Sequence, residues 1–209
     1  ALILARNISR PLQRLSQFAR DIGRGLQVAA PAVGRGEFGL LSQTLQKMQQ
    51  DISAREQDIV YQSQHDSLTG LANRTLVEAQ LPAFLQAQDL QLLLVNIKDF
   101  KHVNDAFGYS NGDLLLQQLG TRLTELPLPL AMVARLGGDE FLLAINEMLD
   151  ERQVLQLQQQ LSSEFQLGES RLNLKVALAT VFCPKQSISS DDALRRVDIA
   201  MVHAKTSNQ

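Results

Sequence analysis

The chain has 209 residues, of which 44% are apolar and 20% are charged, and its formal net charge is −2. This length allows one domain with an appendage or two small domains, and the composition is that of a folded protein. A single cysteine, Cys183, excludes a disulfide framework and a metal site built from cysteines. The lack of Trp and the slightly negative charge argue against a nucleic acid polymer as partner.

Charge is unevenly distributed along the chain. Residues 1–60 carry eight Lys or Arg and five Asp or Glu, a net of +3; residues 65–209 carry twelve and seventeen, a net of −5. The cations Arg6, Arg10 and Arg14 follow the apolar stretch ALILA at the start of the sequence. We interpret this stretch as the end of a membrane helix whose remainder is missing, with arginines marking the cytoplasmic side. An ordinary solvated helix start is the alternative.

Two stretches carry apolar residues at alternating spacings of three and four. The first predicts a helix over residues 6–27 with Pro11 in its first turn, followed by a connector over 28–36. The second predicts a helix from Phe38 to Ile59. Both stripes are narrow, as in a coiled-coil seam, so we expect self-association; packing on the chain's own domain is the alternative. The seam residues are Ile8, Leu12, Leu15, Ala19, Ile22, Leu26, Phe38, Leu41, Leu45, Met48, Ile52, Arg55 and Ile59.

From residue 65 onward the pattern becomes that of a mixed α/β domain. The apolar run at residues 92–97 indicates a strand buried on both faces. The other predicted elements are a helix over 111–126, a hairpin of 132–136 and 141–145, a helix over 150–165, a strand with one wet face over 171–178, and a last helix capped at residues 190–192. This order predicts a sheet flanked by helices.

Polar side chains are expected at one edge of this sheet. Asn96 lies at the carboxyl end of the buried strand, and Asp139 and Glu140 lie at the hairpin tip. These groups converge where open sheets bind ligands, if the strand is central and the hairpin adjacent. Acidic groups there suit Mg²⁺, and Gly137 and Gly138 let a phosphate or base approach the backbone. A plain hairpin turn is the alternative.

The sequence around this turn resembles a known signature. Residues 135–141, RLGGDEF, resemble the GGDEF signature of diguanylate cyclases. Three further stretches, at residues 66–74, 100–113 and 198–205, resemble the family's other motifs in the same order and spacing. The resemblance covers residues 65–209 and implies an α+β sandwich of the nucleotidyl-cyclase type, a sheet flanked by helices.

The N-terminal part resembles a second family. A helix, a connector and a helix, with Pro11 in the first helix and Glu37-Phe38-Gly39 opening the second, resemble a HAMP domain. HAMP domains are all-α coiled-coil bundles of four parallel helices formed by a dimer. We therefore expect a HAMP relay over residues 1–55, a signalling helix over 56–64 and a GGDEF domain over 65–209.

The GGDEF resemblance implies a reaction and a set of site residues. Such domains condense two GTP molecules into cyclic di-GMP in a homodimer, with Mg²⁺ or Mn²⁺ as cofactor. The catalytic residues implied are Asp139, Glu140 and Lys101. The substrate-binding residues implied are Phe100, Asn104, Tyr109, Asp113, Gly137, Gly138 and Lys205. The metal ligands implied are Asn96, the Ile97 carbonyl and Asp139. Among these, Asn104 and Asp113 face the guanine edge, and the lysines face phosphates.

The sequence departs from the family pattern at several positions. Asn96 stands where the family has a metal-binding Asp, and Gln209 stands where it has a phosphate-binding Arg. Each loss removes charge from a charge-stabilised transition state, so we expect impaired activity. Leu128 and Ala131 replace the Arg and Asp of the family's inhibitory motif, so we expect no product-inhibition site.

Two functional hypotheses follow. The first is a diguanylate cyclase with impaired activity, controlled by the HAMP helices of a dimer. The second is a catalytically degenerate domain that binds GTP, or acts only structurally, and relays a signal to a downstream phosphodiesterase-type domain. Both place the protein at the cytoplasmic face of the bacterial inner membrane, attached through the missing N-terminal membrane segment.

Overall fold

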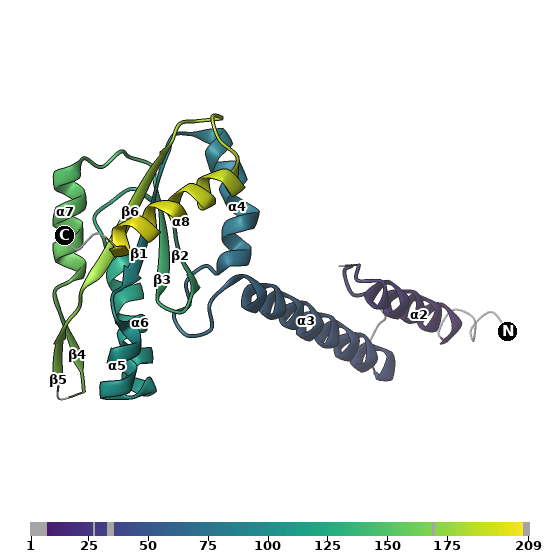
Figure 1. Ribbon diagram of the computed structural model, residues 1–209. Helices are drawn as coiled ribbons and strands as arrows, with labels where there is room; N and C mark the ends of the chain where they lie inside the picture. Colours follow the sequence, from purple (N-terminus) through teal and green to yellow (C-terminus); the bar gives the residue numbers. More distant parts are fainter. Residues whose placement is uncertain (1–7, 27, 33–35, 169, 207–209) are drawn as a thin grey trace. The chain divides into compact units, whose positions relative to one another are not determined.

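The computed structural model describes residues 8–26, 28–32, 36–168 and 170–206. The chain separates into two compact units, Ala1–Tyr61 and Gln62–Gln209 (Figure 1). The expected end of a membrane helix at residues 1–5, Arg6 and the position of Gln209 lie outside the described residues. In the described ranges, no helix is both long enough and apolar enough to cross a membrane.

The first unit is built from helix α2 (Arg10–Gly23) and most of helix α3 (Glu37–Gln64). Helix α2 is shorter than the predicted 6–27, and its C-cap is Arg24, followed by Gly25 with a φ of 75°. Its buried residues are Leu15, Phe18 and Ile22, so Phe18, which lies beside the predicted seam, is part of the buried face.

Most of the predicted seam is exposed within the single chain. The exposed members are Ile8, Leu12, Ala19, Leu26, Leu41, Met48, Ile52, Arg55 and Ile59. Ser42, whose hydroxyl donates to the carbonyl of Pro31 at 3.0 Å, is the buried residue of α3 among those described. The chain's own first unit therefore leaves an apolar stripe along α3 uncovered.

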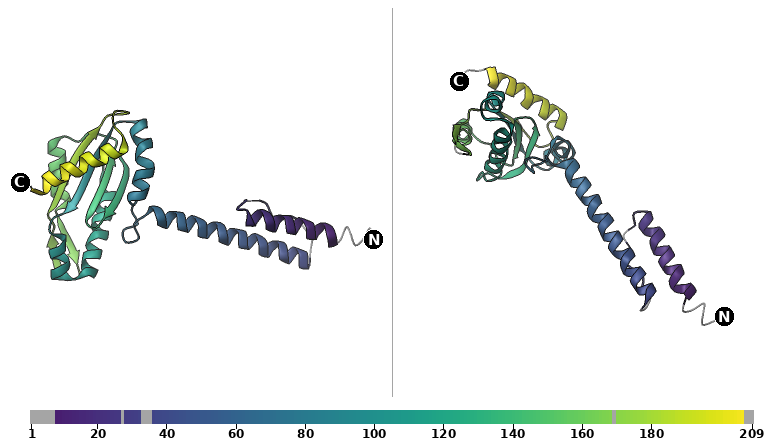
Figure 2. Two further views of the ribbon diagram at one scale, coloured as in Figure 1. Left: turned by 45° about the vertical axis from the view of Figure 1, so that its right-hand side comes forward. Right: turned by 90° about the horizontal axis from the view of Figure 1, so that it is seen from below.

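The second unit is a sheet between two layers of helices (Figures 1 and 2). Its elements are α4 (Arg74–Ala87), β1 (Leu90–Ile97), α5 (Phe100–Phe107), α6 (Tyr109–Thr124), β2 (Leu130–Gly137), β3 (Glu140–Ile145), α7 (Glu151–Leu161), β4 (Glu164–Leu167), β5 (Ser170–Asn173), β6 (Val176–Cys183) and α8 (Ser190–Thr206). The main sheet has the order β2-β3-β1-β6 with every pair antiparallel, and β4 and β5 form a separate hairpin.

The central strand β1 is buried on both faces, as its apolar run predicts. Leu93, Val95 and Ile97 pack into the layer that contains α6 and α7. Leu92 and Leu94 pack into the opposite layer, which contains α4 and α8. In Figure 2 the helix α8 crosses this second face of the sheet. The predicted sheet flanked by helices is confirmed, and the hairpin of β2 and β3 lies directly beside β1.

Several predicted boundaries are wrong. The strand expected over 171–178 is two elements, β5 and β6, and the adjacent residues Val176 and Ala177 are both buried, so β6 does not have one wet face. The helix expected over 150–165 ends at Leu161, and Phe165 lies in β4. Helices α4 and α5 were not among the predicted elements. The predicted cap of α8 begins one residue earlier, since the Ser189 hydroxyl accepts the N–H of Asp192 at 3.1 Å.

Candidate functional site

The turn between β2 and β3 forms one wall of the candidate site. Gly137 has a φ of 141° and Gly138 a φ of 53°, values that residues with a Cβ rarely adopt. The guanidinium of Arg135 donates to the Gly138 carbonyl from Nε at 3.0 Å and from Nη2 at 2.7 Å. The two glycines therefore allow the backbone conformation of the turn, and the Arg135 hydrogen bonds hold it in place. Because neither glycine has a side chain, the backbone of the turn is left uncovered.

Asn96 and Asp139 lie close together at the end of this turn, where β3 begins. In the β1–β3 pairing Asn96 is opposite Glu140, and the N–H of Ile97 donates to the Asp139 carbonyl at 3.3 Å. Asn96 is only 4% exposed, and its side chain lies close enough to the Asp139 carboxyl to lower the pKa of that group. The predicted convergence of the strand end and the hairpin tip is therefore present in the fold.

Burial of the Asp139 carboxyl dominates its electrostatics. Burial raises its pKa and the nearby Glu140 adds to this, while a backbone hydrogen bond, the positive charge of Lys205 and the neighbouring Asn96 side chain lower it. The net pKa of Asp139 is raised from its ordinary value. A partly buried carboxylate whose charge is costly is one that a bound cation would stabilise.

A lysine from α8 reaches the same turn. Lys205 Nζ lies 3.2 Å from Glu140 Oε1, and both side chains are partly exposed. Such a pair contributes little to stability and can open readily. Lys205 is thus placed beside the turn, where a phosphate group would compete with Glu140 for its ammonium group.

The residues expected to bind the guanine lie on the two helices that follow β1. Asn104 on α5 is half-buried, whereas Asp113 and Tyr109 on α6 are exposed. The two helices meet at Gly108, which has a φ of 82° and donates its N–H to the Asn104 carbonyl at 2.8 Å. Lys101 is exposed on α5, and within the described residues it has no ion pair. Phe100 begins α5 and packs partly against the core.

The donor set at the turn fits a cation carried by a phosphate ligand. Asp139 offers one carboxylate, Asn96 an amide oxygen and Ile97 a carbonyl oxygen, which are the oxygen ligands that Mg²⁺ prefers. The described residues contain no cluster of three or more His, Cys, Asp or Glu able to hold a metal. One negative charge is sufficient where substrate phosphates complete the coordination, as is usual for Mg²⁺.

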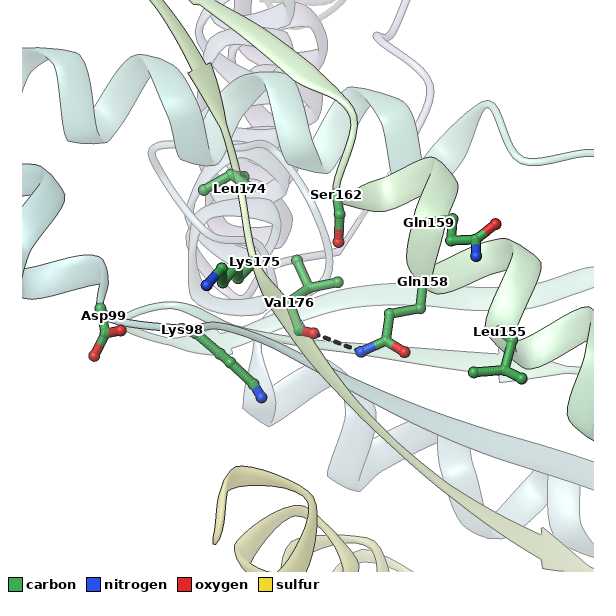
Figure 3. A pocket seen from close by; sticks show the side chains of 9 residues that line it. All are labelled: Lys98, Asp99, Leu155, Gln158, Gln159, Ser162, Leu174, Lys175 and Val176. Carbon is green, nitrogen blue, oxygen red and sulfur yellow. Dashed lines mark hydrogen bonds between the residues drawn. The ribbon is translucent and has the colours of Figure 1, made fainter. Parts of the chain in front are cut away.

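A separate pocket lies on the other side of β1, between the start of β6 and α7 (Figure 3). Its volume is about 480 Å³, and its lining includes Lys98, Lys175 and Gln158, whose amide donates to the Val176 carbonyl at 2.8 Å. The figure shows the Lys98 side chain extending below Val176, away from Asp99. None of the residues expected to bind substrate or metal lines this pocket. Lys98, two residues after Asn96, thus belongs to this pocket.

The sequence patterns do not predict one ion pair near the site, which joins Asp66 and Arg135. Asp66 and Arg135 both lie in motifs that carry the family resemblance, yet no spacing rule links residues 69 positions apart. In the structure they form an ion pair that joins the segment after α3 to the hairpin turn. The signal that could have suggested it is an Arg two positions before a pair of glycines, where a turn carbonyl needs a donor.

Comparison with known proteins assigns both units of the chain. Residues 63–209 match the family described as "Diguanylate cyclase, GGDEF domain", and residues 3–54 match the HAMP domain. The GGDEF match covers more than half of the chain.

Curated and solved relatives agree with this assignment. The chain is 35% identical over 182 residues to "Diguanylate cyclase DgcP" of Escherichia coli K12, covering 82% of this chain and 53% of that protein. It is 26% identical over 221 residues to "Diguanylate cyclase TpbB" of Pseudomonas aeruginosa PAO1, covering 97% and 51%. A solved sensory box/GGDEF family protein of Caulobacter crescentus CB15 superposes with a TM-score of 0.61 at 28% identity, covering 69% and 99%. The chain spans about half the length of the two curated relatives.

Proposed function

We propose that this chain, which belongs to the diguanylate cyclase GGDEF family and carries a HAMP domain ahead of the GGDEF domain, is a cyclic di-GMP signalling module that binds GTP with Mg²⁺ or Mn²⁺ and works as a dimer. The single observation that carries the proposal is that strand pairing places Asn96 and Ile97 next to Asp139, beside a turn whose two glycines leave its backbone uncovered. These oxygen atoms and the open backbone suit a triphosphate and its cation.

Residues at the turn and on α5, α6 and α8 have different roles in binding the substrate. Asn96, Ile97 and Asp139 would supply oxygen ligands to the cation, which when bound would neutralise charge on the triphosphate. Lys205 and Lys101 meet phosphate oxygens as point charges, and Phe100, Gly137 and Gly138 border the phosphate path. Asn104 and Asp113, with Tyr109 beside them, face the guanine.

Asp139 is the general base of the proposed reaction, with Glu140 beside it. A 3′-hydroxyl from the GTP of one subunit attacks the α-phosphate held by the other, its proton passes to Asp139, and pyrophosphate leaves. Because each subunit holds one GTP, the distance and orientation between the two subunits control the rate of the reaction.

The proposed rate is low, because Asn96 contributes no charge. Losing one carboxylate from a charge-stabilised transition state costs on the order of 10²–10³ in rate. The same observation favours a second candidate function, a degenerate domain that binds GTP and relays a signal to a downstream phosphodiesterase-type domain. The position of Gln209, the other departure, lies outside the described residues.

The proposed organisation keeps the boundaries 1–55 for the HAMP domain, 56–64 for the signalling helix and 65–209 for the GGDEF domain. Helix α3 runs without a break from Glu37 to Gln64, so it would carry motion past residue 56 directly. The N–H of Asn73 donates to the Gln64 carbonyl at 2.9 Å, which ties the end of α3 to the GGDEF domain. The proposed location is the cytoplasmic face of the bacterial inner membrane, supported by the HAMP domain.

The decisive assay compares the native chain with Asn96→Asp, each incubated with GTP and Mg²⁺ or Mn²⁺ and analysed for cyclic di-GMP. Slow product from the native chain and faster product from Asn96→Asp establishes the impaired cyclase. If only Asn96→Asp forms product, the native domain is catalytically inactive because it lacks the carboxylate at position 96. GTP binding without product from either chain supports the relay, and the absence of both binding and product contradicts the proposal. Asp139→Asn is the matched negative control at the same site.

A further inference from the structure

Gly112 provides the space in which the Asn104 side chain lies. It is a buried residue in the second turn of α6, directly before Asp113. A Cβ placed on Gly112 would overlap Oδ1 of Asn104 and would lie 3.0 Å from its Cγ and 3.4 Å from Cζ of Phe100. Any residue other than glycine therefore displaces the Asn104 amide.

Packing alone positions this amide. Within the described residues the Asn104 side chain has no hydrogen-bond partner, and none of their buried side-chain N or O atoms lacks one. The Asn104 amide atoms are consequently open to solvent and free to meet a ligand. No hydrogen bond would return the side chain to its place if the contact with Gly112 were changed.

We propose that Gly112 is a positioning residue that sets the Asn104 amide oxygen to accept a hydrogen bond from the exocyclic amine of guanine, and that it thereby determines the preference for guanine. This inference rests on the proposed GTP site. Asp113 directly follows Gly112 on α6, and the missing side chain of Gly112 leaves room for the Oδ1 atom of Asn104 against this helix. A site built to hydrogen-bond a substrate group discriminates strongly against an analogue that lacks it, provided that its polar groups are correctly placed.

The test measures Kd for GTP and for inosine triphosphate, which lacks the exocyclic amine of guanine, by calorimetry on the full chain. Gly112→Ala raises the Kd for GTP about tenfold, the loss expected for one misplaced hydrogen bond. Its Kd for inosine triphosphate changes by less than about threefold, so selectivity falls. A purely structural defect would weaken both nucleotides equally.

Gly120→Ala is the matched control, because Gly120 is another buried glycine on α6. A Cβ there meets the flexible Leu71 Cδ1 at 3.2 Å, and selectivity should not change. Alanine favours a helix over glycine, so circular dichroism should show both variants folded. A Gly120→Ala variant with the same loss of selectivity would overturn the inference.

The double variant Gly112→Ala/Asn104→Ala removes the overlap and completes the cycle. If Gly112 acts only through Asn104, the double variant binds both nucleotides as Asn104→Ala does.

Native selectivity in Gly112→Ala, or further weakening in the double variant, would overturn the inference. If Gly112→Ala does not fold but the double variant does, the overlap between the new Cβ and the Asn104 side chain is the cause, and the inference is supported. If neither variant folds, the inference is overturned. If the native chain binds no GTP, the proposed function itself fails, which is seen before any variant is made.

Discussion

Arg135 pairs with Asp66 across 69 residues of sequence: its Nη1 lies 2.9 Å from Oδ1 and 3.1 Å from Oδ2. Both side chains are largely buried, with exposed fractions of 11% and 21%. Thr69 adds two bonds to the same Asp66 carboxylate, from its N–H at 2.9 Å and its hydroxyl at 2.7 Å. Since Arg135 also holds the Gly138 carbonyl, the segment after α3 and the glycine turn share one guanidinium.

Replacing this arginine should both destabilise the domain and loosen the turn. Arg135→Met removes the positive partner of the Asp66 carboxylate, which keeps only its bonds from Thr69, and also the side-chain donor to the Gly138 carbonyl. We expect a loss of about 3 kcal/mol in the free energy of unfolding. Urea denaturation measures it. Arg171→Ala is the control, because its pair with Glu164 at 3.3 Å is exposed and should contribute less than about 1 kcal/mol. Equal losses in the two variants would contradict the role of Arg135.

The stability contributed by Asp66 should depend on pH. Burial raises its pKa, but hydrogen bonds from Thr69 and Arg135 outweigh burial, so its net pKa lies below the ordinary 3.8. The folded state therefore holds the proton less tightly than the unfolded state. This stabilisation is complete above the unfolded pKa and is lost as pH falls through the folded pKa. The difference in unfolding free energy between the native chain and Asp66→Asn should thus shrink from about pH 5 to about pH 3. A difference that stays constant would count against this assignment.

Asp139 should behave in the opposite way, because its pKa is raised in the folded state. The folded protein binds this proton more tightly than the unfolded chain, so stability falls as pH rises through the interval above the ordinary value of 3.8. At neutral pH, Asp139→Asn should raise the thermal midpoint in differential scanning calorimetry while abolishing cyclase activity. A lower midpoint would show that the ionised Asp139 contributes net stability.

The uncovered stripe along α3 should form the dimer contact. Ile52→Glu places a charge in the seam, and we expect the dimer Kd to rise by at least about tenfold, the loss of one buried aliphatic side chain. Analytical ultracentrifugation measures it. Gln50→Glu adds the same charge two residues away, at an exposed position outside the seam, and should leave the Kd unchanged. A native chain that is monomeric at all concentrations would exclude this surface as a dimer contact.

Local patterns predicted the elements whose residues repeat regularly. Three local patterns have a direct physical cause: the apolar run of β1, the glycines of the hairpin turn and the narrow apolar stripe of α3. Helix α4 was missed although Asn73 is an N-cap residue, its side chain accepting the N–H of Leu76 at 3.1 Å; Pro82 inside the helix weakens the pattern.

Other features depend on distant residues. Helix α7 ends near Arg122 of α6, whose guanidinium donates to the Glu164 carbonyl at 3.0 Å and lies 3.7 Å from the Phe165 ring centre. Nothing near residue 161 encodes that contact. At the candidate site, the positions of Asn96 and Asp139 followed from strand order, whereas the Arg135 link and the space at Gly112 are apparent only in three dimensions.

The most direct test of the central claim is a calorimetric GTP titration, with Mg²⁺ and with a chelator, of the native chain, Asp139→Asn and Asp113→Ala. A triphosphate and its cation held together at Asn96 and Asp139 predict native binding that weakens without Mg²⁺. Asp139→Asn should lose this metal dependence, whereas Asp113→Ala should bind more weakly in both conditions. Native GTP binding that is indifferent to Mg²⁺ and to both substitutions would contradict the account.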